Sequence, residues 1–200
     1  MKKLTCFLIG VFNVLILSAQ ITKLHEDVKE VHVIDGKVAF LKEIPSPEKY
    51  SRSANFQKLK DWAREEYGKD PFISSVRYDS RRYEIIAKSR IELLLPIDSK
   101  NIQEKFIMRY RVNGYIFPDR CVLEVTDISY MYQKVNGDAS KSLPRVVKAE
   151  EFITDRTIAK DDELTEIKTN LRKSTLQFIN QLNKNFEVVF GYVPTFYQQK

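Results

Sequence analysis

The chain has 200 residues and a formal net charge of +6, from 33 lysines and arginines against 27 aspartates and glutamates. Both signs are interspersed along the chain, which is ordinary for a water-exposed surface and excludes the concentrated basic character of a nucleic-acid-binding domain. With only 6 glycines, there is little material for a phosphate-binding glycine loop or a serine elbow, and neither motif occurs.

The amino terminus is typical of a secretory signal peptide. Two lysines precede an apolar stretch over residues 4–17, and Ser18-Ala19 follows. The stretch is shorter than the roughly 20 apolar residues that a membrane-spanning helix needs. We therefore expect residues 1–19 to be removed and the mature protein to be exported to the periplasm or the cell envelope. An uncleaved membrane anchor is the alternative.

One domain is expected after the cleavage site, because the remaining length of about 180 residues is within the usual range for a single core. We divide it into a flexible polar leader over residues 20–30, an α+β domain over residues 31–190 and an aromatic tail over residues 191–200. The tail is either an interaction segment or a last strand. No apolar segment of membrane-spanning length follows residue 19, and Cys121 is then the one cysteine left, so no internal disulfide can form.

The periodicity of apolar residues predicts both strands and helices. In chain order we expect a hairpin that turns at Asp35-Gly36, a helix over residues 53–67 that ends at Gly68, four strands over residues 72–78, 82–95, 105–112 and 121–132, and a long helix over residues 164–186. The last strand changes parity, because its apolar residues are odd-numbered over residues 121–125 and even-numbered over residues 128–132. This predicts a β-bulge or a strand end near Thr126-Asp127.

Three local motifs, taken in order, resemble a known family. They are Asp35-Gly36-Lys37-Val38 with Phe40, the sequence LKDWAREEY around Trp62, and Val125-Thr126-Asp127-Ile128-Ser129-Tyr130. Over residues 31–132 the chain is similar to exported bacterial proteins grouped as domain of unknown function 4468, whose fold is like that of the TATA-binding protein (TBP). The resemblance implies a curved antiparallel sheet with helices packed on one face, and it implies no reaction. The turn over residues 113–120 departs from the family's pattern, and we expect it to be longer than usual.

Four basic residues share one face of the predicted sheet, the face opposite the helices. They are Lys88, Arg90, Arg109 and Arg111. These four form the candidate binding face, for an unknown envelope protein or ligand. The alternative is that Glu84, Glu92 and Glu124 pair with them across the strands and only solvate the face.

No catalytic, cofactor-binding or metal-ligating residues are predicted. His25 lies in the leader and His32 in the first strand, and together with Cys121 they are too few and too scattered for a zinc site or a catalytic base. We therefore expect a non-enzymatic protein that needs no cofactor. Because it is expected to be exported, it would not meet chromosomal nucleic acid.

Two other functions stay open. The first is a carrier of a small apolar ligand, held between the sheet and the long helix in a pocket lined by Phe106, Met108, Tyr110 and Phe178. The second is a hydrolase that uses paired carboxylates from residues 150–163. Acidic residues at the start of a helix also favour its positive end, which is the simpler explanation for that segment.

Overall fold

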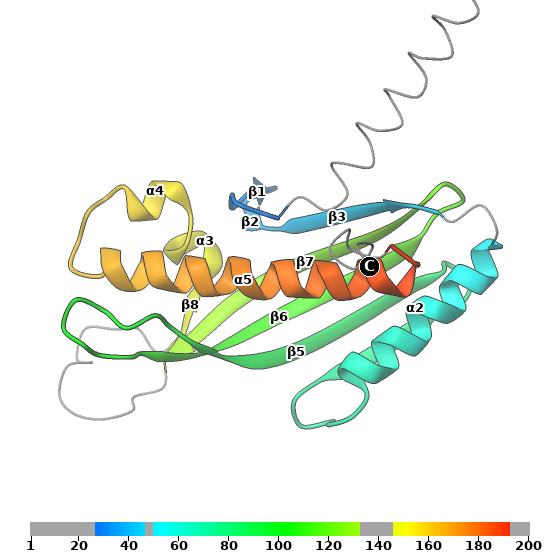
Figure 1. Cartoon of the computed structure of the whole chain (residues 1–200), viewed down its shortest axis with the longest axis horizontal. Helices are drawn as coiled ribbons and strands as arrows, with labels where there is room; N and C mark the ends of the chain where they lie inside the picture. The colour runs from blue at the N-terminus through cyan, green and yellow to red at the C-terminus, as the bar shows by residue number, and fades with distance from the viewer. Residues whose placement is uncertain (1–26, 47–49, 133–145, 193–200) are drawn as a thin grey trace, which may run out of the picture.

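The structure is a computed structural model that describes residues 27–46, 50–132 and 146–192 (Figure 1). The predicted signal peptide, most of the leader and the tail beyond Tyr192 lie outside these ranges, so what was expected of them stays a prediction. Within the described ranges, no helix is both long and apolar enough to cross a membrane.

The main sheet is antiparallel, with strand order β3-β7-β6-β5-β4, and it is curved and open (Figure 1). Consecutive strands from β4 to β7 pair with one another, which confirms the predicted meander. The outer edge of β7 is shared, because β3 pairs with its residues 120–125 and β8 with its residues 129–131. The strands are β3 (Phe40–Pro45), β4 (Ser75–Asp79), β5 (Glu84–Leu94), β6 (Lys105–Ile116), β7 (Arg120–Tyr132) and β8 (Val146–Lys148).

The predicted turn at Asp35-Gly36 closes a small hairpin of its own. In it β1 (Val33–Ile34) pairs with β2 (Lys37–Val38). Both turn residues have positive φ, 50° at Asp35 and 77° at Gly36, a conformation that aspartate and glycine adopt at low cost. The following strand, β3, belongs to the main sheet, where it pairs with β7.

Helices cover one face of the sheet, as α2 and α5 show in Figure 1. The α2 helix begins after Ser51, whose Oγ accepts a hydrogen bond from Ala54 N–H (3.2 Å), and it ends at Gly68 as predicted. Trp62 is only 5% exposed and packs edge-on against Phe186 of α5, with ring centroids 5.7 Å apart. The helices are α2 (Arg52–Tyr67), α3 (Ala149–Phe152), α4 (Asp155–Ile158) and α5 (Thr165–Val189).

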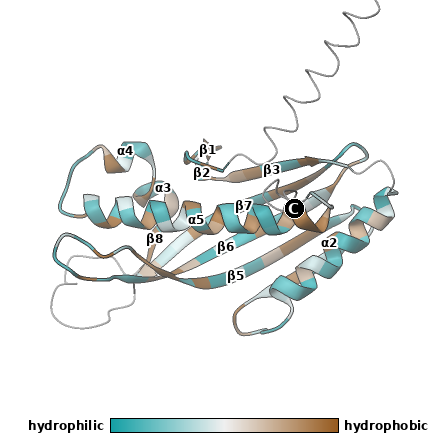
Figure 2. Cartoon of the chain, viewed as in Figure 1, coloured by the Kyte–Doolittle hydropathy of each residue, from teal (hydrophilic) through white to brown (hydrophobic). Residues whose placement is uncertain are grey.

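The long helix α5 follows the predicted pattern. Apolar residues recur between polar ones along it (Figure 2), and Leu171, Ile179 and Phe186 are fully buried against the sheet. It ends at Val189, and shortly after it Gly191 has a φ of 85° and Tyr192 N–H donates to Glu187 O (3.1 Å). Glycine in this conformation is the usual stop of such a helix.

The predicted bulge is confirmed at Asp127. Arg109 pairs with Ser129 and Arg111 pairs with Thr126, so two residues of β7 stand opposite one residue of β6. Asp127 takes up the extra length with a φ of 51°, which strengthens the local twist and keeps the apolar residues on both sides of it facing the helices.

The turn between β6 and β7 is shorter than we expected. Ile116 pairs with Cys121, and Phe117 N–H donates to Arg120 O (2.8 Å), so Pro118 and Asp119 alone form the loop. The prediction of a long turn was wrong because β6 continues past residue 112 to Ile116.

Candidate binding cleft on the open sheet face

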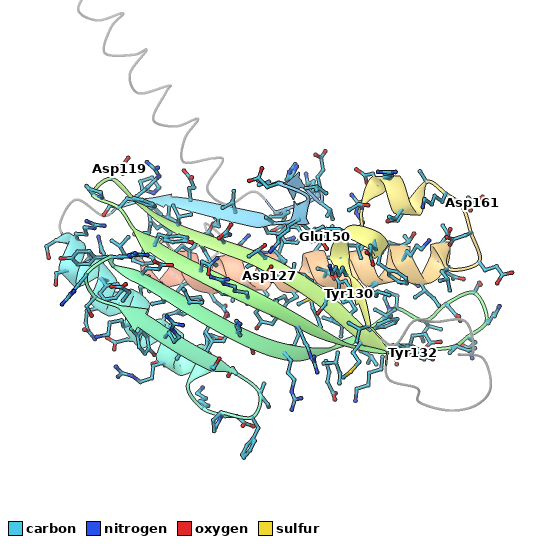
Figure 3. The ribbon with its side chains drawn as sticks, turned by 180° about the vertical axis from the view of Figure 1, so that it is seen from behind. Asp119, Asp127, Tyr130, Tyr132, Glu150 and Asp161 are labelled. Carbon is cyan, nitrogen blue, oxygen red and sulfur yellow. The ribbon has the colours of Figure 1, made fainter. Side chains whose placement is uncertain are left out.

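The register of β5 and β6 places the four candidate residues directly opposite one another. Lys88 pairs with Arg111, and Arg90 pairs with Arg109. Their neighbour Ala87 is fully buried on the helix side, so the four side chains are on the open face, as predicted. Figure 3 is viewed from this face, with the strands in front of α5.

The glutamates that could neutralise the basic residues have other partners. Glu92 Oε2 lies 2.7 Å from Lys105 Nζ, and Glu124 Oε2 accepts a hydrogen bond from Asn113 Nδ2 at 2.6 Å. Glu84 stands opposite a tyrosine of β6. The cross-strand pairing that we weighed as the alternative is therefore not the arrangement in the structure.

Three of the four cations form no ion pair with a described residue, although the charge of Lys88, after a hydrogen bond from Lys37, helps to lower the pKa of the Asp127 carboxyl. In the part of the chain that the structure describes, no carboxylate forms an ion pair with Lys88, Arg90 or Arg109. Like charges directly opposite on two strands repel each other, so this arrangement costs the fold some stability.

The fourth cation, Arg111, has local partners. Its Nε donates to Asn113 Oδ1 (2.9 Å), and its Nη1 lies 3.7 Å from Asp127 Oδ2. Asp127 also accepts a hydrogen bond from Lys37 Nζ at 2.6 Å, and this bond, followed by the charges of Lys37 and Arg111, lowers the pKa of its carboxyl. The bulge therefore holds an ionised carboxylate at one end of the basic row, where Figure 3 labels it.

A cleft of about 460 Å³ opens beside the basic residues. Its other wall is the segment over residues 71–75, which connects α2 to β4, and Phe72 in this segment is 86% exposed. Ser74 Oγ donates to Tyr67 O (2.8 Å) and holds the segment to the end of α2. The sequence did not reveal this wall, because we had assigned Phe72 to a strand; Pro71 before it was the available sign of a loop.

A second hollow, of about 300 Å³, lies on the helix side of the same sheet edge. Tyr110 and Phe178 line it and pack edge-on, with ring centroids 5.0 Å apart. Some residues line both hollows, which therefore adjoin where β4 begins. The shared residues are Ile73, Ser74, Ser89, Arg90 and Tyr110.

No family model matches the chain, and no curated protein matches it. Two solved structures do. A TBP-like protein from Parabacteroides distasonis is 27% identical, with a TM-score of 0.65, over 81% of this chain and 96% of that one. A DUF4468 family protein from Bacteroides ovatus is 23% identical, with a TM-score of 0.66, over 84% of this chain and 94% of that one. The chain has the TBP-like fold.

The resemblance inferred from the sequence is thus confirmed, together with the α+β class and the open sheet. A TBP-like fold is a scaffold, and neither likeness brings a reaction or a ligand with it. The chemistry of this TBP-like domain has to be judged from its own residues.

The apolar ligand pocket that we considered is filled by side chains in the TBP-like domain. Phe106 and Met108 are at most 1% exposed and belong to the hydrophobic core, where Phe106 packs against Tyr132. Of the four predicted pocket residues, only Tyr110 and Phe178 line the small hollow on the helix side. The four residues therefore do not line one cavity.

The carboxylates of residues 150–163 are dispersed over the TBP-like domain. Glu150 accepts a hydrogen bond from Val38 N–H (2.7 Å), and Asp162 accepts one from Leu164 N–H (3.0 Å) in the turn before α5. Figure 3 shows Glu150 and Asp161 well apart. Asp155 forms an ion pair with Arg172 and Asp162 with Lys168. These contacts fix the short helices in place and bring no acid and base together.

The remaining reactive groups also have structural surroundings. His32 is exposed, and His25 lies outside the described residues. Cys121 is fully buried, and burial raises the pKa of its thiol to about 12, which keeps it protonated and unreactive. Among the described residues, no group of three or more histidine, cysteine, aspartate or glutamate side chains could hold a metal ion.

Another hollow, of about 870 Å³, lies between residues 27–32 and β3. Charges of both signs line it, and its Lys42 is already paired with the buried Glu187 of α5. Because these charges offset each other, this hollow selects for no particular ligand charge. The basic cleft does, although it is smaller.

Proposed function

We propose that this protein is a non-enzymatic binding domain of the cell envelope, and that it holds an acidic partner protein at the basic cleft. The observation that carries the proposal is a row of three cations on two adjacent strands, Lys88, Arg90 and Arg109, none of which forms an ion pair with a described residue. A fold gains nothing from such a row by itself, whereas a partner with carboxylates would remove the repulsion and gain the attraction.

The composition of the cleft supports a protein partner. Phe72 offers an exposed aromatic ring at the rim of the basic row. Aromatic and arginine side chains are the residue types enriched in protein interfaces and in their energetic centres. Free phosphate or sulfate would use the cations but not the ring.

The experiment starts from the protein purified gently from its own cell envelope and weighed by native mass spectrometry. We expect a retained acidic protein that dissociates as salt is raised, because salt screens exposed charges. The double variant Arg90→Glu with Arg109→Glu should lose it. The matched control, Lys160→Glu, reverses an exposed charge that follows α4 and does not line the cleft, and it should retain the partner.

Other outcomes of this experiment contradict the proposal. A partner that the double variant retains as well as the control does would show that the cleft is not the binding site. A small added mass in place of a protein would favour the ligand carrier, and a bare chain at low salt would exclude a tightly held partner.

Export is a separate part of the proposal and rests on the sequence of residues 1–19. Amino-terminal sequencing of the envelope protein should begin at Gln20. A chain that still begins at Met1 in the membrane fraction would support the uncleaved anchor instead.

A further inference from the structure

One half of β5 has a free edge. β5 has 11 residues, but β4 pairs only with Glu84–Lys88. No strand among the described residues lies beside Ser89–Leu93 on that side, whereas Leu94 is covered by α5, whose Ser174 Oγ donates to Leu94 O (3.4 Å). An unpaired strand edge is a template for another strand, and proteins usually cover or blunt it.

The free edge offers backbone hydrogen-bonding groups at defined positions. At its two ends β5 is bonded to β6 through Ile116 N–H to Tyr83 O (3.0 Å) and Leu95 N–H to Glu104 O (2.9 Å). The register between these bonds is continuous. In an antiparallel ladder every second residue is hydrogen-bonded to the neighbouring strand, so the N–H and C=O groups of the odd-numbered residues of β5 point to β6. The N–H and C=O groups of Arg90 and Glu92 therefore point to the free edge.

The two hollows flank this edge, one on each face of the sheet. The basic cleft with Arg90 and Arg109 is on the open face, and the hollow with Tyr110 and Phe178 is on the helix face. Side chains of a strand point alternately to the two faces. A strand placed here would put every second side chain among the cations and the others against aromatic rings.

We propose that an extended segment of the partner, with acidic and apolar residues in alternation, adds to the sheet as a strand beside Ser89–Leu93. Its backbone pairs with Arg90 and Glu92, its carboxylates meet Arg90 and Arg109, and its apolar side chains enter the hollow beside Tyr110. This inference rests on the proposed function and specifies its partner. An acidic strand should prefer this edge of β5 to the edge of β3, because the cleft here is basic whereas the hollow beside β3 is lined by charges of both signs.

The probe is a phage-displayed library of random peptides of about ten residues, enough for one strand, selected against the full-length protein. We expect the enriched peptides to alternate acidic and apolar residues. Enrichment of acidic residues without alternation would overturn strand addition and leave the proposed function standing. Selection without acidic enrichment would overturn both.

The most enriched peptide is then tested for backbone pairing. Amide hydrogen exchange at Arg90 and Glu92 should slow about tenfold or more on binding, because these amides become hydrogen-bonded. N-methylation of the peptide at the residues whose N–H groups face β5 should weaken binding about tenfold for each bond lost. N-methylation at the intervening residues should have little effect, and equal loss at both sets would overturn the strand geometry.

Two variants separate the failures. Suppose that the peptide binds the unaltered protein without slowing exchange at Arg90 and Glu92, and that the Arg90→Glu and Arg109→Glu double variant loses binding. This result would overturn strand addition alone. If exchange slows in the unaltered protein but the double variant still binds the peptide, recognition of acidic residues by Arg90 and Arg109 would be overturned. The Lys160→Glu protein is the control and should bind as the unaltered protein does.

Discussion

Replacing Arg109 with glutamate is expected to stabilise the fold while it weakens binding at the cleft. Arg109 stands opposite Arg90, and neither has a carboxylate partner among the described residues. The substitution converts a repulsive cross-strand pair into an attractive one.

The expected magnitude follows from the exposure of the pair. A cross-strand charge pair contributes roughly 0.2–1 kcal/mol to the free energy of unfolding, and solvent screening keeps an exposed pair at the lower end of this range. Losing the repulsion and gaining the attraction together should raise the free energy of unfolding by about 0.5–1 kcal/mol at low salt. With a urea dependence of about 2 kcal/mol per molar, the midpoint of unfolding rises by about 0.3–0.5 M.

The assay is urea unfolding at low salt and again in about 1 M salt, where the screening length falls to roughly 3 Å and the difference should disappear. Arg77→Glu is the control, because Arg77 on β4 stands opposite the uncharged Ile86 and its midpoint should not rise. If Arg109→Glu lowers the midpoint, or if its gain persists in high salt, the reasoning is refuted. A confirmed gain would mean that the basic row is kept at a cost in stability.

Three further predictions concern the rest of the fold. Gly114→Ala should destabilise the protein by about 1–3 kcal/mol in urea unfolding, since a Cβ there would stand 2.8 Å from Ile85 Cγ1 and 3.2 Å from Leu59 side-chain carbons; an unchanged midpoint would contradict this. Burial raises the pKa of Cys121 to about 12, so this thiol should resist alkylation at pH 8 in the folded protein and react after unfolding. Mass spectrometry can count the alkyl groups added in each state. Asp127→Asn, at a φ that asparagine tolerates, should lower the free energy of unfolding by less than about 1 kcal/mol near neutral pH. Because the pKa of Asp127 is lowered in the folded state, this loss should be present above about pH 4 and vanish as the pH falls through the lowered pKa; a loss that persists in acid would assign the effect to the turn geometry.

Much of the site could be predicted because strand alternation has a fixed period of two. Alternation alone placed Lys88 and Arg109 on the open face, and a parity change alone located the bulge at Thr126-Asp127. Both inferences need only local sequence, since a one-residue change of phase moves every following side chain to the other face.

What could not be predicted depends on contacts between distant segments. The sequence does not show that Arg90 faces Arg109, because the register is set by the length of the turns on either side. Nor does it show that residues 71–75 form a wall beside these cations, since the loop's position depends on how α2 packs. The shared outer edge of β7, with β3 and β8 end to end, joins segments that no local pattern connects.

The shared edge of β7 also orders the events of folding. The β6–β7 hairpin closes through a two-residue loop and is local, whereas β3 must close a chain segment of about 80 residues before it pairs with residues 120–125. Until that contact forms, half of β7 presents an unpaired edge to other chains. We therefore expect the step at which the early part of the chain reaches β7 to limit the folding rate and to set the interval during which the protein is most prone to aggregate.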